Sequence, residues 1–271
     1  MNSKYVENVY LNHQKRGSVS PIKLVVNYPK PELSYQPILR AGKVFVQDFT
    51  RGELSKLYTI DLSTGKTKLI GSIAKAVTDI AFMGDRLYGI ARQDDCETTQ
   101  LIKIDPVTAR STIIGDVGLN VVGLAYNRIR NTLFGATAKQ LIAIDLNTGK
   151  GTPLVTVANQ DFNCGQLAFD RNGIPYITLI DSCHKKYLVT TDLYNGTLTF
   201  LGNIGFPNLS SIEFFDDFLY GVSGKCFGLA SDGKLIRIDI TNGTGTLITN
   251  TDSLGDWVGI AIYKQIECDR P

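Results

Sequence analysis

A short apolar segment recurs along this chain of 271 residues, and three of its copies carry a polar side chain that could do chemistry. The copies are Thr78-Asp-Ile-Ala-Phe, Val122-Gly-Leu-Ala-Tyr, Gly165-Gln-Leu-Ala-Phe, Ser210-Ser-Ile-Glu-Phe and Val258-Gly-Ile-Ala-Ile. Asp79 and Gln166 share one position of the repeat, whereas Glu213 replaces the alanine of the other four copies. Two carboxylates at one site could act as general acid and base or hold a cation. We therefore predict Asp79 and Glu213 as catalytic residues and Gln166 as a ligand-binding residue; the alternative is a solvated channel lined by polar groups.

Two further residues extend this candidate site. Gln36, in Tyr35-Gln-Pro-Ile-Leu39, aligns with Asp79 and Gln166. Trp257, the only tryptophan, begins the last copy of the segment. An indole ring could stack on a ligand or seal the last structural unit, because its large ring combines an apolar body with one polar N–H. Gln36 and Trp257 are therefore predicted as ligand-binding residues.

A second candidate set lies in the polar stretch Asp181-Ser-Cys-His. A histidine that titrates near neutral pH could serve as an auxiliary base, so His184 is the third predicted catalytic residue. Asp181 and Cys183 are predicted to bind ligand at the same place. The alternative for Cys183 is a small apolar residue that fills a loop cavity.

These residues sit within a repeat of 40 to 47 residues, marked by a motif that occurs five times. Its copies begin with Leu57-Tyr-Thr-Ile-Asp-Leu, Leu101-Ile-Lys-Ile-Asp-Pro, Leu141-Ile-Ala-Ile-Asp-Leu, Leu188-Val-Thr-Thr-Asp-Leu and Leu235-Ile-Arg-Ile-Asp-Ile. Most copies are followed by a turn rich in Gly and Asn, which tight hairpins require. The recurrent aspartates precede these turns, so we interpret them as turn-forming residues rather than as a site.

Four short β-strands per repeat predict a four-stranded antiparallel sheet, and a ring of such sheets predicts an all-β propeller. We predict six blades in one domain spanning residues 1–271. Their approximate ranges are 34–73, 77–117, 121–157, 164–205, 209–250, and a split blade of 257–268 plus 4–28 that closes the ring by pairing the terminal strands. The alternative is five blades plus an N-terminal extension.

The two faces of this ring differ. The loop face carries the connections between the second and third strands, which are long at 92–100, 180–187 and 222–234, and the connections between blades. The turn face carries the short turns between the first and second and between the third and fourth strands, such as 83–85 and 215–217. Long loops on a rigid scaffold are where sites usually lie, so we expect binding on the loop face near the central channel.

Composition bounds the partners and the compartment. The formal net charge of +2 lacks the basic excess of a nucleic-acid binder, and no apolar run is long enough to span a bilayer. The chain begins without the apolar core of a signal peptide, and its five cysteines show no paired spacing. We expect a cytoplasmic protein that binds neither nucleic acid nor membrane, with an oligomeric state that the sequence leaves open.

The motif Leu101-Ile-Lys-Ile-Asp-Pro-x-Thr, preceded by Leu87-Tyr-Gly, resembles the repeats of six-bladed propellers of the NHL-repeat, SMP-30 and strictosidine-synthase-like kind. The resemblance implies the architecture. Enzymes of that superfamily place metal-binding or acid/base residues at the axial ends of their inner strands, and here only Asp79, Gln166 and Glu213 stand in comparable positions.

Two functions follow. The first is a propeller that binds a small molecule or a protein partner on the loop face. The alternative is an enzyme of small-molecule metabolism, of hydrolase, lyase or cyclase type, with an axial acid/base or metal-assisted site. A divalent cation such as calcium would be the cofactor of such a site, and otherwise we expect none.

Overall fold

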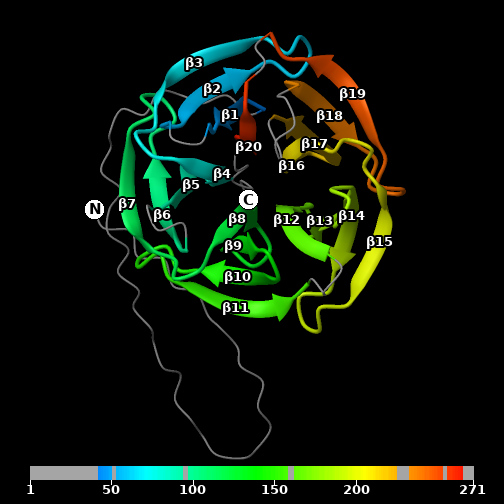
Figure 1. Ribbon diagram of the computed structural model, residues 1–271. Coiled ribbons are helices and arrows are strands. Elements are labelled where there is room, and N and C mark those ends of the chain that lie inside the picture. Colours follow the sequence, from blue (N-terminus) through cyan, green and yellow to red (C-terminus); the bar gives the residue numbers. More distant parts are fainter. Residues whose placement is uncertain are drawn as a thin grey trace, which may run out of the picture. The chain divides into compact units, whose positions relative to one another are not determined.

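The computed structural model describes residues 42–50, 53–93, 97–157, 162–224, 232–252 and 255–264. All of them belong to one of the two units into which the chain divides, Ile38–Pro271. Within these residues, twenty strands form five four-stranded antiparallel sheets. The sheets stand as blades around a common axis (Figure 1).

Each blade runs from an inner strand near the axis to an outer strand at the rim (Figure 1). Blade 1 consists of β20 (Trp257–Ile262), β1 (Val44–Asp48), β2 (Lys56–Ile60) and β3 (Thr67–Ser72). Blade 2 consists of β4 (Val77–Met83), β5 (Arg86–Arg92), β6 (Thr99–Ile104) and β7 (Ser111–Asp116). Blade 3 consists of β8 (Val121–Asn127), β9 (Thr132–Thr137), β10 (Gln140–Ile144) and β11 (Gly151–Thr156).

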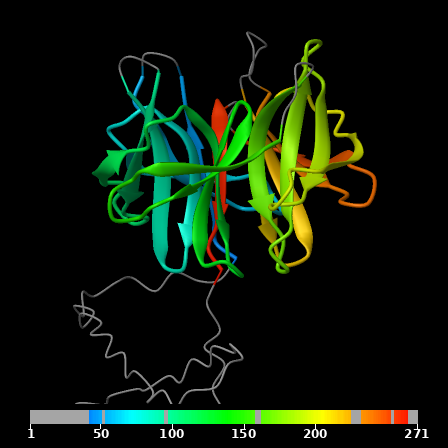
Figure 2. The ribbon, with the colours of Figure 1, turned by 90° about the horizontal axis from the view of Figure 1, so that it is seen from below.

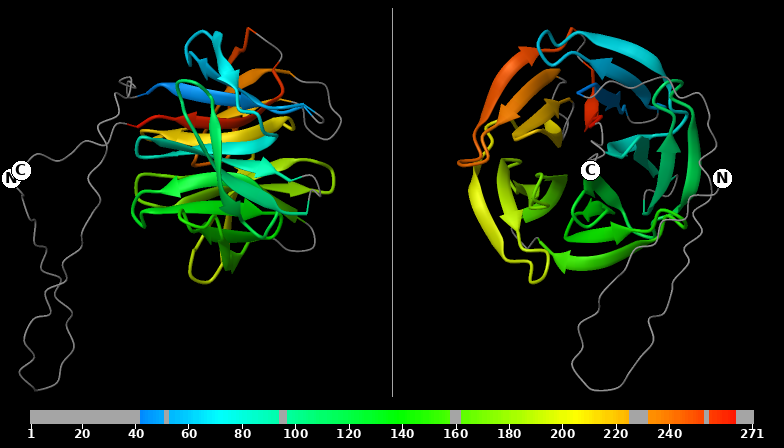
Figure 3. Two further views of the ribbon diagram at one scale, coloured as in Figure 1. Left: turned by 90° about the vertical axis from the view of Figure 1, so that its left-hand side faces the viewer. Right: turned by 180° about the vertical axis from the view of Figure 1, so that it is seen from behind.

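Blade 4 consists of β12 (Phe162–Phe169), β13 (Pro175–Asp181), β14 (Lys186–Thr191) and β15 (Leu198–Asn203). Blade 5 consists of β16 (Leu209–Phe215), β17 (Phe218–Ser223), β18 (Lys234–Ile238) and β19 (Gly245–Asn250). Seen from the side, the strands run between two faces of the ring, where the connections lie (Figures 2 and 3).

The prediction of six blades is wrong, because the described chain forms five. The segment that was expected to open a sixth blade, β20, instead pairs antiparallel with β1, with Ile260 opposite Val46. Strands β1 to β3 need an inner neighbour, and the last copy of the repeat supplies it from the other end of the described chain. The other segments of the expected sixth blade, 4–28 and 265–268, lie outside the described residues, as does the segment around Gln36.

The core lies between neighbouring blades. An aromatic residue of the second strand packs on an aromatic residue near the end of the next blade's inner strand, with ring centroids 5.0 to 5.2 Å apart. The pairs are Phe45 with Phe82, Phe134 with Phe169, and Tyr176 with Phe214. Inner and second strands are mostly buried, whereas the outer strands are exposed or half-buried along their length. Burial of apolar surface between blades therefore stabilises the ring.

The recurrent aspartates form the turns between third and fourth strands, as their sequence position predicts. In blade 1, the backbone N–H groups of Ser63 and Thr64 both donate to Asp61 Oδ1, at 2.9 Å. Gly65 follows with a φ of +69°, and a side chain there would collide with the backbone oxygen of Asn250 in blade 5. The same aspartate-capped turn recurs at Asp105, Asp145, Asp192 and Asp239.

The described residues include no helix that is long and apolar enough to cross a bilayer.

Candidate functional site

The inner strands bring one residue from each blade to a common level near the axis. Each inner strand shows a register shift at this level, and such bulges re-aim side chains. Counting from the bulges, the five equivalent residues are Asp79, Gly123, Gln166, Ser211 and Gly259. Asp79 and Gln166 therefore share this level, as their common repeat position predicts.

Asp79 is held by three hydrogen-bond donors from three blades. The backbone N–H of Ile80 and the hydroxyl of Ser211 donate to Asp79 Oδ1, at 3.0 and 2.9 Å. The backbone N–H of Leu124 donates to Asp79 Oδ2 at 2.8 Å. The Ser211 hydroxyl also accepts from the N–H of Ile260 at 3.2 Å. Asp79 thus ties the edges of the inner strands together.

Gln47 of β1 reaches the same place across a glycine. It lies opposite Gly259, and a Cβ on Gly259 would fall 2.8 Å from Gln47 Nε2 and 3.1 Å from Asp79 Oδ1. The Gln47 side chain is fully buried, and neither of its amide atoms has a hydrogen-bond partner in the described part of the chain. The missing side chain of Gly259 therefore leaves the space that Gln47 and Asp79 share.

Asp79 is 1% exposed, and burial raises the pKa of its carboxyl well above the usual range, with the Glu213 charge adding to the rise. The three hydrogen bonds oppose this pKa rise without reversing it. Glu213 lies nearer the turn face, where its Oε1 receives the Lys264 ammonium at 2.7 Å and the Phe214 N–H at 2.9 Å. Asp79 and Glu213 are thus electrostatically coupled but have separate partners.

The groups around Asp79 are hydrogen-bond donors to its carboxyl group, and they stabilise that group rather than a divalent cation. Both of its oxygens already accept N–H or O–H groups, and Glu213 is neutralised by Lys264. Calcium takes six to eight oxygen ligands, usually with several carboxylates. No cluster of three or more His, Cys, Asp or Glu side chains suited to a metal occurs in the described ranges. The residues present do not fit a divalent cation at the axis.

The second predicted set, Asp181 to His184, lies at the hairpin between β13 and β14 on the loop face. The N–H groups of Cys183 and Lys185 donate to Asp181 Oδ1, at 2.9 and 2.8 Å, and His184 has a φ of 61°. Asp181 also accepts the Tyr187 hydroxyl at 3.2 Å. Asp181 therefore shapes this turn on the loop face, whereas Asp79 and Glu213 lie on the inner strands β4 and β16.

Trp257 is 1% exposed and belongs to the core of blade 1. Its ring packs edge-to-face on Tyr58 at 5.1 Å, and its Nε1 donates to Thr251 Oγ1 at 3.2 Å. These contacts match the interpretation that Trp257 seals the closing blade. Gln166 is half-buried, and its Oε1 atom has no hydrogen-bond partner among the described residues.

Sequence reasoning missed two members of the axial cluster, Ser211 and Gln47. Ser211 occupies the repeat position of Asp79, so the alignment of the inner strands contains that signal. Gln47 stands where the second strands of three other blades carry Ile90, Ala136 and Val222. A polar residue at a position that is apolar in three other blades could therefore have been recognised from the sequence.

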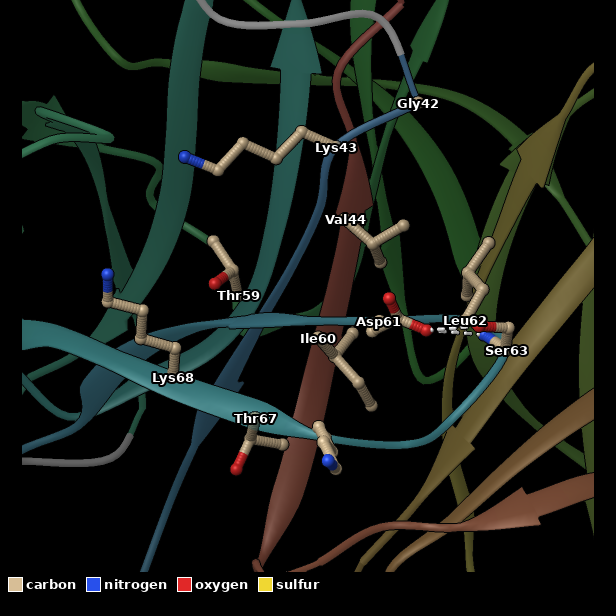
Figure 4. A pocket seen from close by; sticks show the side chains of 11 residues that line it. Gly42, Lys43, Val44, Thr59, Ile60, Asp61, Leu62, Ser63, Thr67 and Lys68 are labelled. Carbon is tan, nitrogen blue, oxygen red and sulfur yellow. Dashed lines mark hydrogen bonds between the residues drawn. The ribbon is translucent and has the colours of Figure 1, made fainter.

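A hollow of about 580 Å³ lies on the turn-face side of blade 1 (Figure 4). The start of β1, the end of β2 and the start of β3 line it. Three of its lining residues are lysines, namely Lys43, Lys66 and Lys68, and none forms a salt bridge within the described part of the chain. The hollow therefore combines open volume with three lysine side chains and the carboxylate of Asp61.

A second feature of the turn face is a patch in which arginines lie beside exposed apolar rings, spread over blades 3 to 5. Tyr194 is 87% exposed and lies 4.9 Å below the Arg130 guanidinium, and the neighbouring Ile129 is 65% exposed. In blade 5, Arg237 stacks on Phe218 at 3.8 Å. We call this the arginine–aromatic patch; its residues are Ile129, Arg130, Arg171, Tyr194, Phe218 and Arg237.

Comparison with known proteins supports the architecture. No family model matches the chain, and no curated protein matches it. A solved structure entitled "Crystal structure of Nidogen/Laminin Complex" contains a chain that aligns with a TM-score of 0.56 and 12% identity, covering 82% of this chain and 98% of that one. Identity this low shows the fold alone. The chain is a β-propeller with five blades in its described residues, and no particular propeller family is shown for it.

Proposed function

We propose that this protein is a binding propeller whose turn face takes a protein partner through the arginine–aromatic patch. The observation that carries the proposal is the exposure of Tyr194 and Ile129 beside Arg130 on a rigid ring. Tyrosine and arginine are enriched in protein interfaces and among the residues that dominate binding energy.

The patch is continuous because the turns of neighbouring blades contact one another. Asn127 Nδ2 donates to the Gly173 carbonyl at 3.1 Å, which joins the turns of blades 3 and 4. Arg171 pairs with Asp217 at 3.2 Å, which joins the turns of blades 4 and 5. Preformed turns lose little conformational freedom on binding, so a partner would meet a surface that needs little ordering.

The loop face, where the sequence places the longest connections, is the competing location. Among the described residues it exposes one large apolar side chain, Leu54, whereas the turn face exposes Val107, Ile129, Ile174, Tyr194 and Phe218. Within the described ranges, exposed apolar side chains therefore gather on the turn face. Binding of a small molecule at the loop face is the alternative hypothesis, and it rests on the length of the loops there.

The enzyme alternative finds less support at the axis. The Asp79 side chain is buried, with 1% of its surface exposed, and it accepts hydrogen bonds from three donors of the protein. A general acid or base must come within hydrogen-bond reach of the substrate atom it serves. Glu213 is 9% exposed and bound to Lys264, so it offers a substrate little surface.

Site-specific photo-cross-linking tests the proposal and the competing face together. A benzophenone amino acid is placed at position 194 on the turn face or at position 183 on the loop face, and each protein is irradiated in an extract of its source cells. We expect one discrete protein adduct from position 194 that excess wild-type protein removes and excess Arg130→Ala, Ile129→Ser protein does not. Adducts from position 183 alone, or none from either position, would overturn the proposal.

A further inference from the structure

The hollow on blade 1 owes its charge to a residue that the other blades do not have. The strand register forms an equivalent row in each blade, from an aromatic residue of the second strand to a third-strand and a fourth-strand residue. In blade 1 the row is Phe45, Thr59 and Lys68. The fourth-strand member is threonine in every other blade, at Thr112, Thr152, Thr199 and Thr246. Lys68 therefore replaces a threonine that is sufficient for the fold of the other four blades.

Lys43 joins the same row from the entry to β1. It lies two residues before Phe45, so both side chains point to the same side of the sheet. Its Nζ is 5.1 Å from the centre of the Phe45 ring. Figure 4 shows the Thr59 side chain between the long side chains of Lys43 and Lys68. Two ammonium groups and one hydroxyl thus converge on one side of blade 1.

Neither Lys43 nor Lys68 forms a salt bridge within the described part of the chain. Asp61 also lines the hollow, but its Oδ1 accepts two N–H groups and the Ser63 hydroxyl of its own turn. Asp252 accepts the N–H and the hydroxyl of Thr67, which lower the pKa of its carboxyl, and the Lys66 charge lowers it further.

We infer that Lys43, Lys68 and Thr59 form a binding subsite for a tetrahedral oxyanion, namely the phosphate group of a monoester. Lysine binds phosphate oxygens as a compact point charge. The ammonium groups would each donate to one oxygen and the Thr59 hydroxyl to a third. The subsite is separate from the arginine–aromatic patch and does not depend on the proposed partner.

Binding of inorganic phosphate to the full chain tests the inference, measured by isothermal titration at constant ionic strength. We expect saturable binding that Lys68→Thr weakens about tenfold or more, since a hydrogen bond to a charged group contributes about 1.5–3 kcal/mol. Lys68→Thr restores the residue that four other blades carry, so the fold is expected to remain intact. Lys43→Gln, which removes the second ammonium group, should weaken binding to a similar degree.

The matched control is Lys150→Thr, which removes the blade 3 equivalent of Lys66 and should leave the phosphate affinity unchanged. A phosphoserine peptide in place of inorganic phosphate distinguishes a protein-borne phosphate, which would bind more tightly, from a free phosphate monoester. Absence of saturable phosphate binding by the wild type would overturn the inference. So would equal weakening by Lys150→Thr and Lys68→Thr, because that result means general screening rather than a site.

Discussion

At Asp79 and at Lys68 an ionisable side chain stands where the other blades carry uncharged residues, but the surroundings of the two side chains differ. Asp79 is sealed at the axis and receives three hydrogen bonds from its own protein. Lys68 is exposed beside a hollow and forms no salt bridge within the described residues. A polar residue that breaks a repeat thus indicates a binding site when it has no hydrogen-bond or salt-bridge partner within the protein. It indicates a structural role when the protein supplies such partners.

The largest effect that separates the two regions should come from Asp79→Ala. This change leaves the N–H groups of Ile80 and Leu124 and the Ser211 hydroxyl without their acceptor inside the ring. We expect a loss of about 3 kcal/mol or more in unfolding free energy, measured by urea denaturation. Lys68→Thr should stay within about 0.5 kcal/mol of wild type in the same measurement. Similar stability losses for both variants would erase the distinction.

The pH dependence of stability sharpens the account of Asp79. Its pKa in the folded protein is raised, chiefly by burial, so its contribution to stability is full below the pKa of the unfolded chain. That contribution is lost as the pH rises through the folded pKa. Glu213 and, through it, Lys264 are the charged groups to consider near it.

Asp79→Asn removes this titration while keeping the shape of the side chain. The stability of the variant relative to wild type should therefore rise as the pH increases from about 4 towards neutrality. Urea denaturation over that pH range measures the difference. A difference that does not change with pH would show that Asp79 is ionised in the folded protein throughout.

Gln47→Met tests whether the axis needs every polar group it contains. Neither amide atom of Gln47 has a partner in the described residues, and methionine has nearly the same length. We expect unfolding free energy to stay the same or to rise by up to about 1 kcal/mol. A loss of more than about 2 kcal/mol would mean that the amide is satisfied within the axial cluster.

The smallest effect is expected at His184, on the loop face. A residue other than glycine at a φ of 61° carries backbone strain, so His184→Gly should raise stability by up to about 1 kcal/mol. Thermal unfolding measures this change, with Lys185→Gly as the matched control in the same hairpin. If His184 contributes only to the turn, photo-cross-linking from position 194 should be unaffected by the substitution.

Much of the fold could be predicted from the sequence because each blade repeats the same solution. The aspartate-capped turns follow from a local pattern, and the structure confirms them. The blade number was wrong because β20 can be read as the start of a new blade or as the missing inner strand of blade 1. Pairing between distant strands decides this, and periodicity alone does not encode it.

The candidate sites were less predictable. Asp79 and Gln166 were found as departures from the repeat, but their burial depends on how the inner strands converge. Lys68 could have been identified as a departure from the repeat in the same way, by aligning the fourth strands instead of the inner strands. Its neighbours Lys43 and Thr59 come from other strands, and only the register of blade 1 brings the three together.

Amide chemical-shift mapping during a titration with inorganic phosphate tests most directly whether the exposed Lys68 ammonium, rather than the buried Asp79 carboxyl, marks a binding site. The account predicts saturable shifts confined to blade 1, around Lys43, Thr59 and Lys68. Shifts centred on Ile80 and Leu124 at the axis, shifts on the hairpin of His184, or no saturable shifts at all would contradict it.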